Sequence, residues 1–168
     1  MTLKQGAYIL CGYGGVGKSS LTHRLKRSQE ILIDMDSGAY SKHPQFPKNY
    51  LDALRQIMEH SAKKPWVLCS THLAWLEILK QQGYYYVLVC PDQSVSAETW
   101  EKERYLNRDN PEGYIEAMRA NYDRYLTDMY QHAENNPQCL LLTLKAGEYL
   151  SDVFPTIRSW YQQLEAKK

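Results

Sequence analysis

The sequence predicts an α/β protein in which a five-stranded parallel sheet lies between two layers of helices, a three-layer α/β/α arrangement. The alternation of two kinds of segment leads to this fold class. Short apolar runs typical of buried strands alternate with longer segments whose apolar residues recur at helical spacing. Strands that alternate with helices form parallel sheets covered on both faces. The length of 168 residues fits a single domain over residues 1–168.

The expected elements can be placed along the chain. The five strands are expected over residues 7–11, 31–34, 66–70, 84–90 and 139–144. The helices are expected over about 19–27, 50–64, 73–82, 96–107, 114–133 and 150–164. Gly83 closes the third helix, Pro91 stops the fourth strand, and Pro155 is tolerable only because it falls near the start of its helix. Because ligands of parallel sheets bind at the carboxyl ends of the strands, the residues that follow each strand are the candidates for chemistry.

The turn after the first strand fits the P-loop pattern of glycine, four residues, glycine, lysine, then serine or threonine. Its residues, with the serine that follows, are Gly12, Tyr13, Gly14, Gly15, Val16, Gly17, Lys18, Ser19 and Ser20. Glycines let the backbone N–H groups of such a turn point inward, and the helix N-terminus adds partial positive charge. Lys18 can reach the outer phosphates, and the Ser19 hydroxyl can ligate Mg²⁺. The turn therefore predicts a nucleoside triphosphate site.

Two carboxylates follow the second strand. Asp34 and Asp36 are two residues apart, and in an extended segment such residues point the same way. Near a bound triphosphate, Asp34 could hold Mg²⁺ through water, and Asp36 could accept or orient the proton of an attacking hydroxyl. A solvated turn at the end of the strand is the alternative interpretation.

The third strand is followed by Ser70, Thr71 and His72. Many P-loop proteins carry an acidic residue here that supports Mg²⁺, and its absence moves the metal-supporting role toward Asp34. Ser70 or Thr71 can bond a water or a phosphate. For His72, a site residue and a simple helix N-terminal residue are both open interpretations.

Four arginines flank the break at 109–113: Arg104 and Arg108 before it, Arg119 and Arg124 after it. Arginines on both sides of a turn that follows the fourth strand could close over the phosphates and neutralise charge in the transition state. The alternative is a solvent-exposed helix on which Arg104 and Arg108 pair with Glu101 and Glu103.

Composition narrows the possible partners and compartment. Lys and Arg number 20 against 19 Asp and Glu, so the net charge of +1 implies no general attraction to nucleic acid. The 14 tyrosines and 4 tryptophans fit core and groove lining better than a base-stacking platform. The cysteines at 11, 69, 90 and 139 lie in or at the ends of apolar runs, which predicts buried free thiols and a reducing, cytoplasmic location. No stretch approaches membrane-spanning length.

With these features the chain resembles the P-loop kinases of small molecules in the nucleoside monophosphate kinase superfamily. The resemblance implies a short helical lid over about 96–125 that carries the arginines. It implies an adenine-holding loop after the fifth strand, with Lys145 and Gly147, and an acceptor-binding region over about 37–63. The aspartates after the second strand look like those of shikimate and gluconate kinases. The Asp-Arg signature that several nucleotide kinases carry after the third strand is absent, and the chain is also similar to small nucleotide-kinase-like proteins of phages and bacteria.

We therefore expect an ATP- and Mg²⁺-dependent kinase with a small-molecule acceptor. A nucleoside or deoxynucleoside monophosphate is the first choice, a hydroxyl acceptor of the shikimate or gluconate type the second, and a polynucleotide 5′-hydroxyl the third. A nucleotide-binding switch or regulator without phosphoryl transfer is the alternative of another class. A GTPase should carry an Asn-Lys-x-Asp-like signature after a strand, and the sequence has none. The oligomeric state is left open.

The expected residues fall into four groups. The catalytic residues are Lys18, Asp34, Asp36, Arg104 and Arg108. The P-loop residues bind ATP together with Arg104, Lys145 and Gly147. The acceptor-binding residues are Asp36, Ser37, Tyr40, Ser70, Thr71, His72, Arg108 and Arg119. The metal ligands are Ser19 and Asp34.

Overall fold

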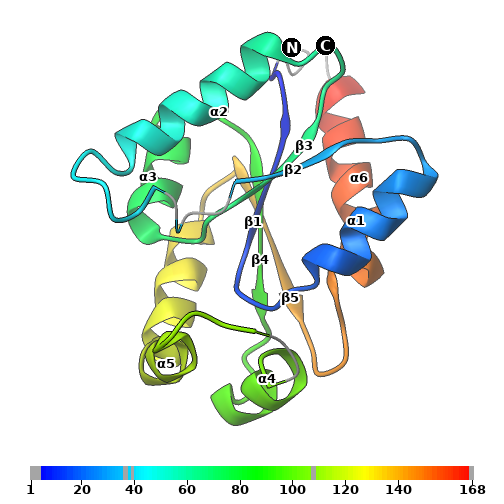
Figure 1. Cartoon of the computed structure of the whole chain (residues 1–168). Coiled ribbons are helices and arrows are strands. Elements are labelled where there is room, and N and C mark those ends of the chain that lie inside the picture. Colours follow the sequence, from blue (N-terminus) through cyan, green and yellow to red (C-terminus); the bar gives the residue numbers. More distant parts are fainter. Residues whose placement is uncertain (1–4, 36–37, 39, 107–108, 167–168) are drawn as a thin grey trace.

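The computed structural model of the chain describes residues 5–35, 38, 40–106 and 109–166. Five strands form one sheet, and helices cover both of its faces (Figure 1). The strands are β1 (Tyr8–Gly12), β2 (Leu32–Asp34), β3 (Trp66–Cys69), β4 (Tyr86–Pro91) and β5 (Cys139–Leu144). The helices of the described part are α1 (Lys18–Arg27), α2 (Lys48–His60), α3 (Leu73–Gln81), α4 (Ala97–Arg104), α5 (Tyr114–Ala133) and α6 (Leu150–Ala166).

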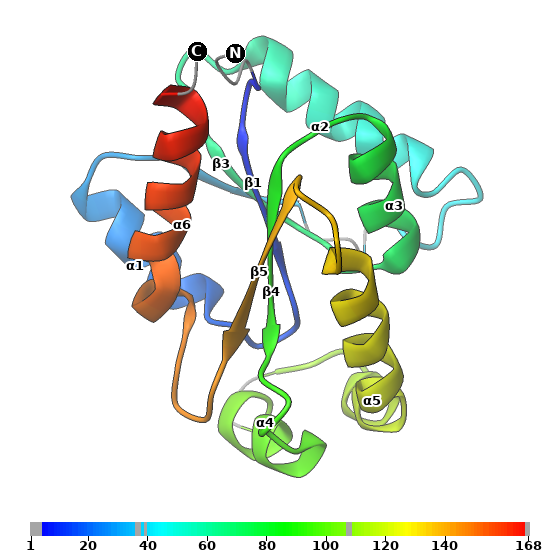
Figure 2. The same ribbon diagram turned by 180° about the vertical axis from the view of Figure 1, so that it is seen from behind.

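The sheet is parallel throughout and has the strand order β2-β3-β1-β4-β5. The predicted three-layer α/β/α fold is therefore confirmed. Helices α2, α3 and α5 lie on one side of the sheet and α1 and α6 on the other, with α4 beyond the carboxyl ends of the strands (Figures 1 and 2). The chain runs from the central strand β1 to β2 and β3 on one side, and then crosses to β4 and β5 on the other side. The carboxyl end of β1 is thus the switch point where parallel sheets bind ligands.

The fourth strand differs from its expected bounds, because it begins at Tyr86 and includes Pro91. Its pairing with β1 ends at Val89, which faces Gly12, whereas its pairing with β5 continues to Pro91 and Leu144. Since β1 has already turned into the P-loop at that level, the missing N–H of Pro91 lies where no ladder bond to β1 is needed. Pro91, which was expected to end the strand before it, is therefore the last residue of β4.

Side-chain hydrogen bonds stabilise the start of α4 and the proline-containing turn of α6. The first turn of α4 is capped by Ser96, whose hydroxyl accepts from the Thr99 N–H at 3.1 Å. In α6, Pro155 leaves the carbonyl of Ser151 without its helical N–H partner, and Arg24 of α1 donates to that carbonyl at 3.0 Å. A contact from the neighbouring helix thus makes the proline tolerable.

The core lies on both faces of the sheet. Strands β3 and β4 are buried along their whole length, and aromatic side chains such as Trp66, Trp75 and Tyr161 fill the space under the helices. All four cysteines are free thiols, as predicted; three of them are buried, whereas Cys139, also expected to be buried, is half-buried. In the part of the chain that the structure describes, no helix combines the length and the apolar character that crossing a bilayer requires.

Candidate active site

The P-loop runs from the end of β1 into α1 in the conformation that its glycines permit. Gly15 and Gly17 have φ values of 91° and 106°, a region that favours glycine. A Cβ on Gly14 would lie 2.1 Å from the Tyr114 hydroxyl, and one on Gly17 would lie 2.9 Å from the Tyr149 ring. The first turn of α1 has neither a side-chain cap nor an acidic residue. Its N–H groups and partial positive charge therefore fit a phosphate.

Lys18 at the end of the P-loop is paired with Asp34 at the end of β2. The lysine Nζ and Asp34 Oδ2 are 2.6 Å apart, and the two side chains are 52% and 38% exposed. Since both groups face solvent, the pair contributes little to stability. Its consequence is positional: it holds together two predicted catalytic charges that follow β1 and β2, the two strands on either side of β3. Ser19, the other expected metal ligand, lies exposed beside Lys18 at the start of α1.

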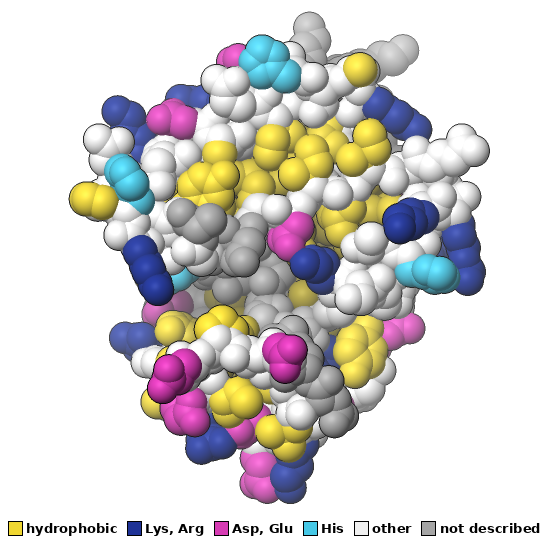
Figure 3. Space-filling view, viewed as in Figure 1, with side chains coloured by type: hydrophobic (Ala, Val, Ile, Leu, Met, Phe, Trp, Pro, Cys, Tyr) yellow, Lys and Arg dark blue, Asp and Glu magenta, His cyan; other side chains and the backbone are white. Residues whose placement is uncertain are grey.

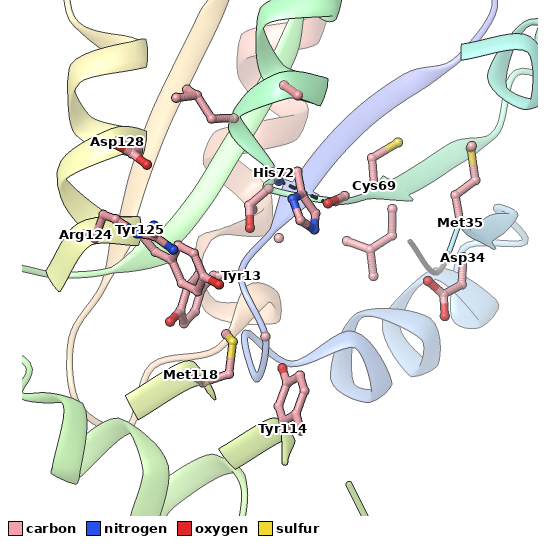
Figure 4. A pocket seen from close by; sticks show the side chains of 17 residues that line it. Tyr13, Asp34, Met35, Cys69, His72, Tyr114, Met118, Arg124, Tyr125 and Asp128 are labelled. Atoms are coloured by element: carbon pink, nitrogen blue, oxygen red, sulfur yellow. Dashed lines mark hydrogen bonds between the residues drawn. The ribbon is translucent and has the colours of Figure 1, made fainter. Parts of the chain in front are cut away.

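A cavity of about 570 Å³ opens beside this pair. Its walls come from the start of the P-loop, the ends of β2 and β3, the start of α3, and α5 (Figure 4). On the face shown in Figure 3, the surface is hollowed between the part that carries α2 and the part that carries α4 and α5. Gly12, Tyr13, Gly14 and Asp34 all line the cavity, so any molecule bound in it lies against the P-loop.

The end of β3 places the predicted Ser70, Thr71 and His72 in this cavity. The Tyr50 hydroxyl of α2 donates to the Met35 carbonyl and accepts from the Ser70 N–H, which ties the ends of β2 and β3 together. The Ser70 hydroxyl in turn accepts from the His72 N–H at 3.0 Å. Burial raises the pKa of the Tyr50 hydroxyl, so it stays protonated and able to donate.

Other predicted acceptor residues lie elsewhere. The guanidinium of Arg119 is 59% exposed and bonds to the carboxylate of Glu101 on α4, away from the main cavity. Tyr40 packs edge-on against Tyr50, with ring centroids 5.1 Å apart, and does not line the cavity. Asp36, Ser37 and Arg108 lie outside the described residues, and their roles remain predictions.

Arg104 was expected to close over the phosphates, with a position on a solvent-exposed helix as the alternative, but in the structure it is buried. Only 1% of its side chain is exposed. Its guanidinium donates to the Gly15 carbonyl at 2.9 Å and to the Glu148 carbonyl at 2.6 Å. It also lies 3.7 Å from the Trp100 ring and 4.4 Å from the Tyr149 ring. Burial lowers the pKa of Arg104, but a guanidinium remains charged at neutral pH.

The loop after β5, which carries the predicted Lys145 and Gly147, is joined to α4 and to the P-loop. The Gly147 N–H donates to both carboxylate oxygens of Glu103 at 3.0 Å, and the Lys145 N–H donates to Glu148 Oε1 at 2.7 Å. The Leu150 N–H donates to the Val16 carbonyl at 2.8 Å. The loop therefore lies at the P-loop, on the side away from α5, where the base of a bound triphosphate is expected.

Of the wall that α5 contributes to the cavity, only Arg124 was a candidate from the sequence, and it was expected to act on the phosphates as part of a lid. This wall consists of Tyr114, Met118, Arg124, Tyr125 and Asp128 (Figure 4). Met118 and Tyr125 belong to the apolar stripe of α5, and a stripe of that spacing predicts core packing. The sequence held one signal of this wall. Tyr114 directly follows the break at 109–113, and the charged residues Arg124 and Asp128 accompany the apolar stripe.

The site thus consists of a P-loop at the switch point of a parallel α/β sheet, a Lys–Asp pair, and a cavity on one side. No protein-family model matches the chain, and no curated protein matches it in sequence. Its fold is similar to that of an uncharacterized protein from Eubacterium ventriosum, with a TM-score of 0.52, 10% identity, and coverage of 95% of this chain and 99% of that one. A shikimate kinase from Bacteroides thetaiotaomicron aligns with a TM-score of 0.46, 15% identity, and coverage of 95% and 98%. Similarity at such identities concerns the fold, so function must be argued from the site.

Proposed function

We propose that this protein is a kinase that transfers the γ-phosphoryl group of ATP to a small acceptor, with a nucleoside or deoxynucleoside monophosphate as the favoured acceptor. The observation that carries the proposal is the cavity that opens directly beside the P-loop and the Lys18–Asp34 pair. A molecule in that cavity would lie next to the outer phosphate of a bound triphosphate. The four free thiols fit a reducing compartment such as the cytoplasm.

In this proposal the P-loop backbone and Lys18 hold the triphosphate. Lys18 is a compact cation at the end of the loop and can bind the β- and γ-phosphate oxygens. Bound Mg²⁺ would neutralise developing phosphate charge, and we expect the oxygen atoms of Ser19 and Asp34 to hold it. The acceptor oxygen forms a bond to the γ-phosphorus while the bond to the β,γ-bridging oxygen breaks, and ADP leaves.

Asp34 has a second effect on Lys18. In the structure the carboxylate holds the ammonium group at the strand end, and the phosphates would compete with it for that cation. The pair also keeps the ammonium group close to its working position before the nucleotide arrives. Transfer then needs only a short movement of one exposed side chain.

The dimensions of the cavity favour a nucleotide over a small polyol. Tyr114 and Asp128 both line it, and they are separated by 14 residues of α5, or about 21 Å of helix. The volume of about 570 Å³ lies within the usual range for sites that enclose a ligand of drug size. A small polyol would leave most of this space to water.

The test is ADP release from the purified chain with ATP and Mg²⁺. The acceptor panel contains the ribo- and deoxynucleoside monophosphates, small polyols, and a 5′-hydroxyl oligonucleotide. We expect release that depends on a nucleoside monophosphate, and a phosphorylated product of the matching mass. ATP binding without acceptor-dependent ADP release would show a regulator instead, and release with a polyol alone would show a hydroxyl kinase.

A further inference from the structure

The wall that α5 contributes to the cavity carries two opposite charges that do not pair with each other. Arg124 and Asp128 are four residues apart, a spacing at which such side chains commonly form an ion pair. Instead, the Arg124 guanidinium donates to Asn121 Oδ1 at 2.8 Å, one turn earlier on the helix. Among the described residues, Asp128 has no hydrogen-bond or ion-pair partner, although it is half-buried and lines the cavity. Both groups are therefore available to a ligand.

A third polar group in the same cavity lacks a partner. The Tyr13 side chain is only 2% exposed, and its hydroxyl is buried without a hydrogen bond to any described residue. Tyr13 also lies beside Tyr125, with ring centroids 6.4 Å apart, so apolar ring surface and polar groups occur together.

The order of the groups along α5 matches the order of groups in a nucleotide. Tyr114, at the start of the helix, lies against Gly14 of the P-loop, where the phosphoryl-accepting end belongs. Arg124 and Asp128 come about 15 and 21 Å farther along the helix axis. Because helical side chains point back toward the N-terminus, both can reach toward the P-loop end. The base would then lie between Tyr125 and Met118 on one side and His72 on the other (Figure 4).

The charges of Arg124 and Asp128 restrict which base can bind in the cavity. A carboxylate accepts hydrogen bonds and is best satisfied by two donors, whereas a guanidinium donates and is best satisfied by two acceptors. Guanine offers both sets side by side, with N1–H and the 2-amino group as donors and O6 and N7 as acceptors. Adenine and cytosine offer a carboxylate only one exocyclic amine, and uracil and thymine offer a single ring N–H.

We infer that Arg124 and Asp128 determine base specificity, and that the acceptor is a guanine nucleoside monophosphate. Asp128 binds N1–H and the 2-amino group, and Arg124 binds O6 and N7. The inference rests on the proposed kinase function only for the transfer step, because recognition of the base can be measured without transfer.

The experiment compares GMP with IMP, which lacks only the 2-amino group. We expect the wild-type chain to favour GMP over IMP in kcat/KM by about 10- to 150-fold, the range of one hydrogen bond to a charged group. Asp128→Ala should bring this ratio close to one. Asp123→Ala is the matched control, because Asp123 lies on the same helix, is exposed and does not line the cavity, and it should leave the ratio unchanged.

A second, independent test replaces Arg124. GMP and IMP share O6 and N7, so Arg124→Gln should lower kcat/KM for both by a similar factor and keep their ratio. A general disturbance of α5 would change the ratio of kcat/KM for GMP and IMP similarly in Asp128→Ala and Arg124→Gln. The same ratios should appear in the affinities of GMP and IMP measured calorimetrically without ATP.

The outcomes separate this inference from the proposed function. Transfer to another nucleotide with GMP no better, or equal use of GMP and IMP by the wild-type chain, would refute the guanine assignment and leave the kinase function standing. Binding of GMP that depends on Asp128, without transfer to any acceptor, would refute the kinase function and support the site. An effect of Asp123→Ala as large as that of Asp128→Ala would refute the role of Asp128.

Discussion

Replacing Arg104 by methionine tests whether this arginine holds the P-loop in place. Methionine keeps an unbranched apolar stem between Trp100 and Tyr149 but removes the bonds to the carbonyls of Gly15 and Glu148. Two hydrogen bonds from a charged group contribute about 3–6 kcal/mol. Release of a buried charge offsets part of that loss, which leaves about 2–3 kcal/mol of destabilisation. For 168 residues this corresponds to a fall in Tm of about 4–12 °C.

The assay combines unfolding with ATP titration. Because Arg104 joins the P-loop to the loop after β5, its loss should weaken ATP binding as well as stability. Arg119→Met is the control, since the pair of Arg119 with Glu101 is exposed to solvent and should contribute little to stability. If Arg104→Met kept wild-type stability and ATP affinity but lost turnover, Arg104 would act on the transferring phosphate, as the lid interpretation predicts, and its role in holding the P-loop would be refuted.

Three further changes test the site and the fold. Lys18→Ala should abolish transfer while the unfolding free energy changes by less than about 1 kcal/mol, because Lys18 is exposed; a mutant with wild-type turnover would contradict the P-loop assignment. Asp34→Ala should raise the Mg²⁺ concentration needed for half-maximal activity, with partial rescue by excess metal, and an unchanged requirement would remove Asp34 from the metal site. The bond from Arg158 holds the pKa of Glu30 at about 2 against an ordinary 4.5, so its contribution is present above pH 4.5 and is lost as the pH falls toward 2. Glu30→Gln should therefore cost about 2 kcal/mol in urea unfolding at pH 7 and progressively less below pH 4.5, and a cost independent of pH would exclude this linkage.

The P-loop and the alternation of strands and helices could be predicted because both are local properties. A glycine pattern determines where the backbone can adopt positive φ, as at Gly15 and Gly17, and a run of apolar residues determines which segments must be buried. The fifth strand, Cys139–Leu144, lies where it was expected, and the first helix ends at the expected Arg27. The residues after β3 likewise lie in the cavity, since strand ends of a parallel sheet meet at one edge.

The environment of each charged residue was decided by the tertiary structure. The spacing of Arg104 is equally consistent with an exposed helix, and only the approach of Gly15 and Glu148, which are far away in sequence, makes it a buried link between two loops. The place of Arg124 and Asp128 in the cavity wall could not be predicted either, because periodicity identifies a face of α5 but does not show whether a neighbour or a cavity lies against it. The sequence by itself determined the P-loop and the fold class through local backbone and burial preferences. Only the packing of distant segments decided which charges are buried, paired or free to bind a ligand.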